Sequence, residues 1–266
     1  MITTLAQRWR ERRDSYRPAG EVIRTGDFEV AALGSDSLAR AFVERHHYSA
    51  SYPAARFRFG LLERGEFVGV AVFSHPSNDR TLTKVFPGSA TDSVELGRFV
   101  LLDRVPGNGE TWFLARCFEQ LRREGLRGVV SFSDPVARTT AAGAVIFGGH
   151  VGTIYQAHNA VYLGRGRPAT LRLLADGRLL APRALSKLRN LERGWRYIAG
   201  QLIAAGASAQ GIGTDPRAWL ERELPRVARG IRHPGNHKYA WALQRSARRD
   251  LERLPTLPYP KFQRAA

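Results

Sequence analysis

Between residues 93 and 134 the chain reads as strand, glycine-rich loop, helix and strand, and this order constrains the fold more than any other feature. The first strand alternates apolar and polar residues, with a slip at Gly97 that predicts a β-bulge. Apolar residues then recur at helical spacing until Gly125, and the run GVVSFSD has the composition of a buried strand. Two strands joined through a helix are expected to be parallel with a right-handed crossover. The segment therefore predicts an α/β fold with a βαβ unit.

The loop between the first strand and the helix, RVPGNG (104–109), has two interpretations. Free N–H groups at the start of a helix bind anions, and Gly107 and Gly109 permit close approach of a phosphate. Alternatively, Asn108 caps the helix and the glycines only form the turn. The loop alone does not decide between a phosphate site and a turn.

The remaining pattern divides the chain near residue 166. Before this point we expect a hairpin with its turn at Arg64 and Gly65, and a helix from Ser35 or Asp36 to Glu44. We also expect a short basic helix over 2–16, one or two strands in 21–33, a short helix near TIYQAHN and a strand AVYLG. Beyond it we expect helices over 182–205, 215–229 and 239–253. These patterns predict a catalytic core over 1–165 and a basic, mainly helical extension over 166–266.

Charge is distributed unevenly along the chain. The net charge is +17, with 20 Lys and Arg against 17 Asp and Glu in residues 1–160, and 21 against 7 in residues 161–266. A basic block beside a nearly neutral one favours a polyanionic partner, most simply nucleic acid, over a merely solvated surface. A membrane surface is disfavoured, because no basic helix offers an apolar face to insert.

Other classes of protein are disfavoured by simple features. No window holds the roughly 18 uninterrupted apolar residues of a membrane span. The N-terminal residues carry charges where a signal peptide needs an apolar run, so we expect no secretion. The single Cys117 has no internal disulfide partner and lies on a helical apolar stripe, where we expect it to pack. These features favour a cytoplasmic protein.

The bulged strand, loop and helix together resemble the pyrophosphate-loop region of the GNAT acetyltransferase superfamily. In that superfamily the loop binds the pyrophosphate of acetyl-coenzyme A, and the bulged strand splays from its parallel neighbour to admit the pantetheine arm. The resemblance implies a GNAT-like mixed sheet and favours the phosphate interpretation of the loop. It implies these cofactor-binding residues: Val100, Leu102, Arg104, Gly107, Asn108, Gly109 and Thr111.

The chain also resembles a narrower group, the Mom family of phage DNA-modification proteins. The resemblance rests on HHYSASYPAARFRFGLL, GVAVFSHP, ELGRFVLLDRVPGNGETWFLAR, GVVSFSDP, GHVGTIYQAHNAVYLGR and HPGNHKYAWAL. It implies transfer of an acetamide-like (methylcarbamoyl) group to the exocyclic amine of adenine in double-stranded DNA, which protects phage or prophage DNA from restriction in a bacterial host. It implies acetyl-coenzyme A as a ligand and iron as a further candidate cofactor. The insert VARTTAAGAVIFGG (136–149) departs from the family pattern.

The candidate catalytic residues come from three segments. The pair His47 and Tyr48 follows a predicted helix, where imidazole can act as a base near neutral pH. Ser133 and Asp134 end a parallel strand, the edge where open α/β sheets place ligands, although Asp-Pro also forms turns. Tyr155 stands where GNAT enzymes often carry the acid that protonates the departing thiolate, and its alternative is core packing.

A metal site is a further candidate, because a methylcarbamoyl product bonds through the methyl carbon of the donor. Simple acid–base catalysis does not readily form that bond, whereas a redox metal held by nitrogen and oxygen ligands provides a route. The candidate ligands are His46, His47 and Asp134.

The basic extension supplies candidate nucleic-acid contacts. Its arginines and lysine between 183 and 196 fall largely on one side of a predicted helix, which suits a phosphate backbone. Trp195, Tyr239 and Trp241 offer faces for base stacking, but core packing is the favoured interpretation for the tryptophans. The candidate contacts are Arg183, Lys187, Arg189, Arg193, Arg196, His237, Lys238 and Tyr239.

Two other functions remain open at this point. A conventional N-acetyltransferase, acting on a protein, small-molecule or aminoacyl-tRNA amine, would acetylate without metal and leave DNA unaltered. A non-catalytic nucleic-acid-binding protein would bind in a salt-sensitive way and show no affinity for coenzyme A.

Overall fold

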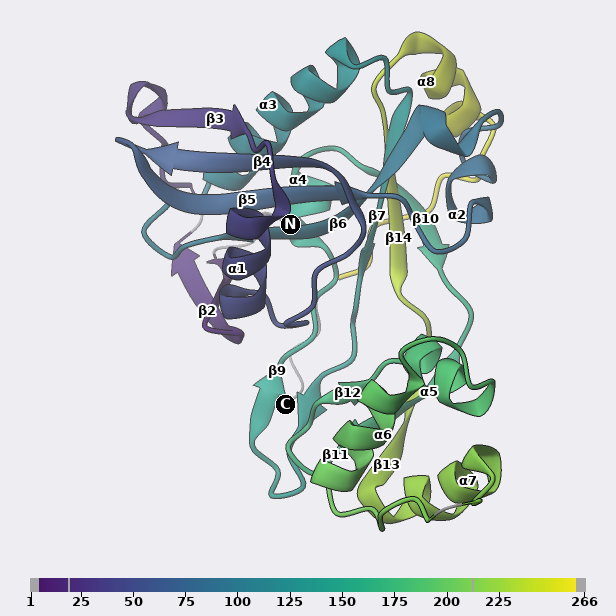
Figure 1. Cartoon of the computed structure of the whole chain (residues 1–266). Coiled ribbons are helices and arrows are strands. Elements are labelled where there is room, and N and C mark those ends of the chain that lie inside the picture. Colours follow the sequence, from purple (N-terminus) through teal and green to yellow (C-terminus); the bar gives the residue numbers. More distant parts are fainter. Residues whose placement is uncertain (1–4, 19, 212, 262–266) are drawn as a thin grey trace. The chain divides into compact units, whose positions relative to one another are not determined.

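The structure, a computed structural model, describes residues 5–18, 20–211 and 213–261. The chain forms two compact units (Figure 1). The first comprises residues 1–135, 149–166 and 236–266, and the second comprises residues 136–148 and 167–235. The expected boundary near residue 166 is therefore only one of several points where the chain passes from one unit to the other. The chain returns to the first unit at Asn236, because the following strand pairs inside its sheet.

A seven-stranded mixed sheet forms the first unit, in the order β10-β14-β7-β6-β5-β4-β3. The β6–β7 pair is parallel and the other neighbouring pairs are antiparallel. This arrangement confirms the predicted α/β class and the βαβ unit. The strands are β3 (Phe28–Ala32), β4 (Ala55–Glu63), β5 (Glu66–Ser74), β6 (Ser93–Leu101), β7 (Gly128–Ser133), β10 (Val161–Arg165) and β14 (His237–Ala242).

The parallel strands β6 and β7 part at the predicted bulge. Their pairing runs from Ser93 opposite Gly128 to Leu96 opposite Ser131. On the other side of β6, Phe73 pairs with Leu96 and Val72 pairs with Arg98, so Gly97 is the extra residue of a bulge. A Cβ atom at this position would lie 2.7 Å from Ser74 Oγ, which explains the glycine.

Helices cover both faces of this sheet. On one face α3 (Gly109–Arg123) buries Phe113, Leu114, Cys117, Phe118 and Leu121 in a core that also holds Tyr155 of α4 (Thr153–Ala157). The alternate side chains of β7 and β14 pack in a second core, with α2 (Arg80–Thr83) and α8 (Arg245–Glu252). The remaining helical elements of this unit are α1 (Asp36–His46) and the short 3₁₀ turns η1 (Thr25–Asp27) and η2 (Ala90–Asp92).

Two of the expected helices in this unit are wrong over the described residues, and residues 2–4 of the helix expected over 2–16 lie outside them. Residues 5–18 form an antiparallel hairpin of β1 (Leu5–Arg10) and β2 (Arg13–Pro18), and its turn residues Glu11 and Arg12 both have positive φ. The expected helix over 239–253 is instead strand β14 followed by α8. In both segments packing overrides local helix propensity: Trp9 of β1 is buried and Tyr239 of β14 is wholly buried.

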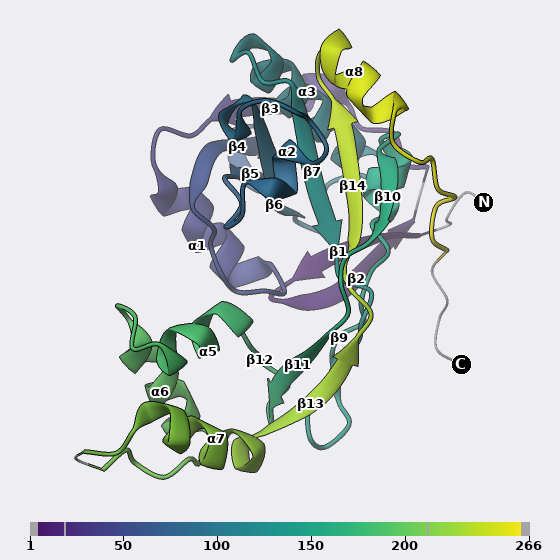
Figure 2. The ribbon, with the colours of Figure 1, turned by 90° about the vertical axis from the view of Figure 1, so that its right-hand side faces the viewer.

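The second unit mixes strands and helices, whereas we expected mainly helices (Figure 2). Its three-stranded sheet has the order β12-β11-β13, and a core around Trp219 joins its three helices. The expected helix over 182–205 is divided, because Leu191 and Gly194 adopt positive φ. The elements are β8 (Arg138–Thr139), β9 (Val145–Phe147), β11 (Ala169–Leu174), β12 (Leu179–Leu180), α5 (Pro182–Arg189), α6 (Trp195–Ala204), α7 (Pro216–Val227) and β13 (Ala228–His233).

Within the described part of the chain, every helix is too short or too polar to cross a lipid bilayer.

Candidate active site

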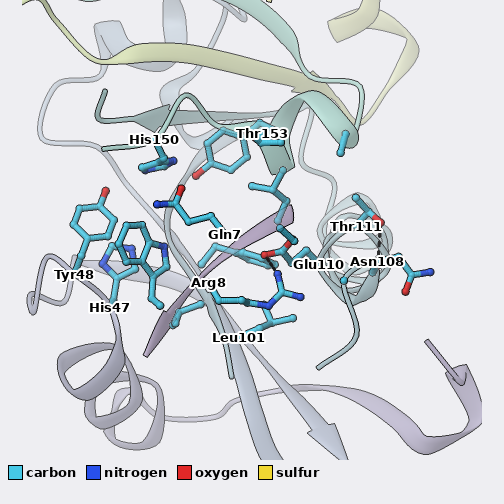
Figure 3. A pocket seen from close by; sticks show the side chains of 18 of the residues that line it. Gln7, Arg8, His47, Tyr48, Leu101, Asn108, Glu110, Thr111, His150 and Thr153 are labelled. Atoms are coloured by element: carbon cyan, nitrogen blue, oxygen red, sulfur yellow. Dashed lines mark hydrogen bonds and ion pairs between the residues drawn. The ribbon is translucent and has the colours of Figure 1, made fainter. Parts of the chain in front are cut away.

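A cavity of about 330 Å³ lies in the first unit, where β6 and β7 part (Figure 3). Its walls come from β1 of the hairpin, the bulged half of β6, the loop that begins α3, and the residues around α4. One end reaches the glycine-rich loop at Gly107 and Asn108. The opposite end is formed by aromatic side chains, among them His47 and Tyr48.

At the loop end, several expected cofactor contacts are already partnered within the chain. The Gly107 N–H donates to Glu21 Oε2 at 3.0 Å, and Asn108 Oδ1 accepts from the Ile23 N–H at 2.8 Å. Asn108 is the N-cap residue of α3, but its side chain does not bond to the helix, so the capping interpretation is wrong in that detail. Thr111 Oγ1 donates to the carbonyl of Asn108 at 3.0 Å and lines the cavity.

The other expected cofactor residues divide between the wall of the cavity and its surroundings. Val100 lines the cavity and is buried, whereas Leu102 does not line it. Arg104 pairs with Glu63 and Glu66 of the β4–β5 hairpin, at 3.0 and 2.5 Å, and does not line the cavity. Gly109 is needed for packing, since a Cβ atom there would lie 2.5 Å from Val105 Cγ1.

A buried ion pair crosses the middle of the cavity wall. Arg8 of β1 is 1% exposed and pairs with Glu110 in the first turn of α3 (Figure 3). Its Nη2 also donates to the carbonyls of Val105 and Pro106, at 3.3 and 3.1 Å. Burial raises the pKa of Glu110, while the guanidinium of Arg8 opposes that rise. Sequence reasoning missed this pair, because it placed Arg8 on a surface helix.

Four aromatic rings gather at the other end. His47 and Tyr48 stack with ring centroids 4.2 Å apart, and Trp9 lies 4.6 Å from Tyr48. His150 meets Trp9 and Tyr48 edge-on, at 6.0 and 5.9 Å. Rings in offset and edge-on contact form an apolar wall suited to a flat heteroaromatic ligand.

The hydrogen bonds of His47 fix its chemistry. The Ser49 N–H donates to His47 Nδ1 at 3.1 Å, so Nδ1 is the unprotonated nitrogen of the ring. Burial lowers the pKa of His47 well below its usual value, and the ring is neutral at pH 7. A neutral ring of this tautomer carries its proton on Nε2, so His47 offers a hydrogen-bond donor rather than the expected base.

Tyr155 lines the cavity from α4 and is the expected catalytic residue with the clearest geometry. The side chains of Tyr155, Tyr239 and Ser133 surround Gly152. A Cβ atom at that position would lie 2.8 Å from each tyrosine ring and 3.1 Å from Ser133 Oγ. Burial raises the pKa of Tyr155, which keeps the phenol protonated near neutral pH.

Ser133 and Asp134 lie at the end of β7, behind the lining of the cavity. Both are buried, and among the described residues Ser133 Oγ has no hydrogen-bond partner. The carbonyl of Asp134 accepts from the His150 N–H at 2.8 Å. This backbone hydrogen bond helps to hold His150 among the aromatic rings of the cavity. The sequence did not predict the contact between Asp134 and His150.

The expected iron ligands do not form a metal site. His46 points its ring at Phe42, with centroids 4.7 Å apart, and does not line the cavity. His47 Nδ1 is already bonded to Ser49. No group of three or more His, Cys, Asp or Glu side chains with metal-binding geometry occurs in the described ranges. The residues present do not fit an iron ion.

Two charged residues of β6 flank the bulge and act on Tyr155 electrostatically. Burial raises the pKa of Glu95 and lowers that of Arg98, whose Nε donates to the Ser51 carbonyl at 2.7 Å. The field of Glu95 raises the pKa of Tyr155 and the field of Arg98 lowers it. The signal for these residues was their charge inside a strand pattern, on either side of Gly97.

Three of the expected nucleic-acid contacts lie on β14, the strand between β10 and β7, and the two that are buried, His237 and Tyr239, are wrong. His237 is 1% exposed, Tyr239 is wholly buried, and Lys238 donates to the Thr81 carbonyl at 3.0 Å. Burial and the charge of Arg165 lower the pKa of His237 to about 4.

The expected basic stripe of the second unit is distributed over two helices and the turn between them. Arg183 forms an ion pair with Glu192, and Lys187 is half-buried. Arg189, Arg193 and Arg196 are exposed, and the guanidinium of Arg196 lies 5.0 Å from the ring centre of Trp195. Tyr197, which follows Arg196 in the chain, is exposed and was not among the expected contacts.

Comparisons with solved structures found distant likenesses among acetyltransferases. An N-acetyltransferase from Staphylococcus aureus Mu50 is 9% identical, with a TM-score of 0.36, over 82% of this chain and 99% of that one. A tandem GNAT protein from the clavulanic acid biosynthesis pathway is 10% identical, with a TM-score of 0.40, over 82% and 99%. A polyamine N-acetyltransferase from Drosophila melanogaster is 11% identical, with a TM-score of 0.39, over 81% and 100%. Likenesses this distant do not assign an activity.

A comparison with curated protein sequences gave no significant match. A model of the Mom protein family, in contrast, matches residues 27–261, which span the sheet, the cavity walls from β6 to α4, and the second unit. A match over this much of the chain is decisive. The chain belongs to the Mom protein family.

Proposed function

We propose that this protein is a DNA-modification enzyme that transfers an acetyl-derived group from a coenzyme A thioester to the exocyclic amine of adenine. The observation that carries the proposal is the parting of β6 and β7 at Gly97, with the glycine-rich loop at one end of the resulting cavity and aromatic rings at the other. Membership of the Mom family supports DNA as the substrate. The product we propose carries the acetamide-like (methylcarbamoyl) group and protects phage or prophage DNA from restriction.

The loop end is where we place the phosphates of the donor. The Gly107 N–H and the guanidinium of Arg17 lie together there, and both are donors that suit a pyrophosphate. Thr111 adds a hydroxyl, and Val100 contributes backbone and apolar surface along the cavity wall. The donor supplies an activated carbonyl carbon next to a sulfur leaving group.

Proton transfers fall to the residues around Tyr155. In transfer through the carbonyl carbon, a bond forms from the adenine nitrogen to that carbon and the carbon–sulfur bond breaks. The departing sulfur takes the proton of the Tyr155 hydroxyl, which its raised pKa holds in place until then. The amine proton leaves to solvent.

The methylcarbamoyl product needs more than this transfer. It contains one additional nitrogen and bonds through the methyl carbon, so it requires an amide nitrogen and an oxidant beyond the thioester. The described side chains do not fit iron, and no step through a metal is assigned. The two products differ by one NH group, which makes mass spectrometry the direct discriminator.

The aromatic end of the cavity suits the acceptor base. An adenine amine inside duplex DNA is reached when the base flips out and stacks on aromatic side chains. Trp9, Tyr48 and His150 supply the rings, and His47 supplies an Nε2–H donor to a ring nitrogen of the base. The second unit, with 14 basic against 5 acidic residues, supplies charge for the phosphate backbone.

The test is nucleoside mass spectrometry of DNA from bacteria that express the protein, beside a Tyr155→Phe control that removes only the proposed proton donor. A new adenine nucleoside with the acetamide increment, reduced in the control, is the expected result. A simple acetyl increment would keep DNA as the substrate and correct the product. Unmodified DNA from cells with abundant folded protein would overturn the proposal and favour a conventional N-acetyltransferase.

A further inference from the structure

The segment between the N-terminal hairpin and β3 lies on the loop that we propose for the donor phosphates. Glu21 Oε2 accepts from the Gly107 N–H at 3.0 Å, and Glu21 Oε1 accepts from Arg17 Nη2 at 3.0 Å. Two residues later, the Ile23 N–H donates to Asn108 Oδ1 at 2.8 Å. A carboxylate, a backbone N–H and a guanidinium thus meet at one point of the loop.

These contacts have the chemistry of a bound phosphate. A carboxylate and a phosphate oxygen accept from the same donors, and the start of a helix attracts either anion. The hydrogen bond from Arg17 lowers the pKa of Glu21, so the carboxylate is ionised at neutral pH. The loop therefore holds a negative charge that the chain itself provides.

Ile23 anchors the segment by burial beside Gly109, whereas the contacts around Glu21 and Arg17 are polar. Arg17 also donates to the carbonyl of Asp103, and Ser15 Oγ donates to Asp103 Oδ1 at 2.6 Å. The side chains of Glu21 and Arg17 are 32% and 28% exposed, so water reaches the contact. Partly exposed ion pairs contribute little stability, which makes this one suited to exchange.

The family comparison separates this segment from the rest of the cavity. The match to the Mom family begins at residue 27, so Glu21, Arg17 and the hairpin lie outside the matched residues, whereas Gly107 and Asn108 lie within them. The loop belongs to the family pattern, and the carboxylate placed on it comes from a segment outside that pattern.

We propose that Glu21 is a built-in competitor that occupies the phosphate position of the loop and is displaced when a pyrophosphate-bearing ligand binds. Arg17 and the Gly107 N–H then transfer from the carboxylate to the ligand phosphate. The proposal rests on the proposed donor site. Its consequence is that removing the carboxylate and removing the guanidinium have opposite effects on affinity, which a purely structural contact does not produce.

Titration calorimetry of the full chain tests this with three ligands: coenzyme A, S-acetylpantetheine, which lacks the pyrophosphate, and inorganic pyrophosphate. Glu21→Gln is expected to tighten coenzyme A binding about tenfold, since less of the protein is in the blocked state. Arg17→Gln is expected to weaken it about tenfold through loss of a phosphate contact. Neither variant changes S-acetylpantetheine binding. The charge-matched controls, Glu29→Gln and Arg24→Gln, alter exposed residues of β3 and the turn before it.

The outcomes separate this inference from the proposed function. If Glu21→Gln binds coenzyme A and pyrophosphate no tighter than the wild type or Glu29→Gln does, the inference is overturned and the donor site stands. If no variant binds coenzyme A while Glu21→Gln gains affinity for pyrophosphate, the result supports Glu21 as a competitor for phosphate. It also overturns the coenzyme A thioester as the donor in the proposed function. Equal tightening of S-acetylpantetheine binding would also overturn the inference, because the carboxylate would then block the whole cavity.

Discussion

The two units hold their charged groups in different environments. In the first unit the pKa values of Tyr155, Glu110 and Glu95 are raised by burial, and that of Arg98 is lowered by it. In the second unit the shifts of Arg183 and Glu192 come from their mutual hydrogen bonds at the surface. Burial shifts these pKa values by removing the charged form from water, whereas surface pairing shifts them by stabilising the charged form.

This contrast suggests that the two units have different roles, chemistry in the first and attraction of a polyanion in the second. Groups whose proton affinity is altered by burial are suited to chemistry, and exposed guanidinium groups are suited to long-range attraction of a polyanion. Substitutions in the first unit are therefore expected to change turnover and pH dependence, and substitutions in the second to change the salt dependence of binding. Effects that crossed from one unit to the other would contradict this contrast.

The largest expected effect is on turnover, in Tyr155→Phe. The ring packing in the core is kept and only the hydroxyl is lost, so the variant is expected to fold and to bind DNA normally. Modification of DNA should fall by about 10²- to 10⁴-fold, the usual contribution of a general acid. Quantitative nucleoside mass spectrometry measures the loss. Tyr52→Phe is the matched control, since its hydroxyl donates to Asp36 away from the cavity.

An intermediate effect is expected on the pH dependence of stability, through His237. Its folded-state pKa is lowered to about 4 from the model-peptide value of 6.5. As the pH falls below 6.5, the unfolded chain takes up a proton and the folded one does not, so stability is lost between pH 6.5 and 4. At pH 5 the loss is about 2 kcal/mol. Urea unfolding at pH 7 and 5 should show this loss in the wild type and a flatter dependence in His237→Gln. Equal pH dependence in both proteins would contradict it.

The βαβ unit was predictable from sequence because its signals are local. The slip at Gly97 marks the bulge, and the helical spacing up to Leu121 marks α3. Tyr155, Val100 and Thr111 came from the family resemblance rather than from periodicity, and all three line the cavity. Local periodicity was therefore sufficient for the elements of this unit, whereas its site residues needed the family resemblance.

Residues placed by distant packing were not predictable. Arg8 and Trp9 enter the cavity wall because a hairpin folds across β6, and nothing in their own segment distinguishes that strand from a basic helix. The strand β14 was mistaken for a DNA-binding helix, since its position between β7 and β10 depends on residues about 75 to 110 positions away. Charge alone also overestimated the availability of Arg183 for DNA. Its ion pair with Glu192 forms because α5 ends before Glu192, which the expected continuous helix did not allow for.

The smallest expected effect is on DNA affinity, in the double variant Arg193→Gln with Arg196→Gln. Both side chains are exposed in the second unit, beside the exposed ring of Tyr197. Loss of two phosphate contacts should weaken binding of a duplex about tenfold at low salt and make the salt dependence shallower by roughly two contacts. Fluorescence anisotropy over a series of salt concentrations measures both quantities.

The control is Arg123→Gln with Arg248→Gln, which removes the same charge from exposed positions of the first unit. If the control weakens binding equally, net charge rather than this surface attracts the DNA. If coenzyme A affinity falls as well, the assignment of separate roles to the two units is wrong.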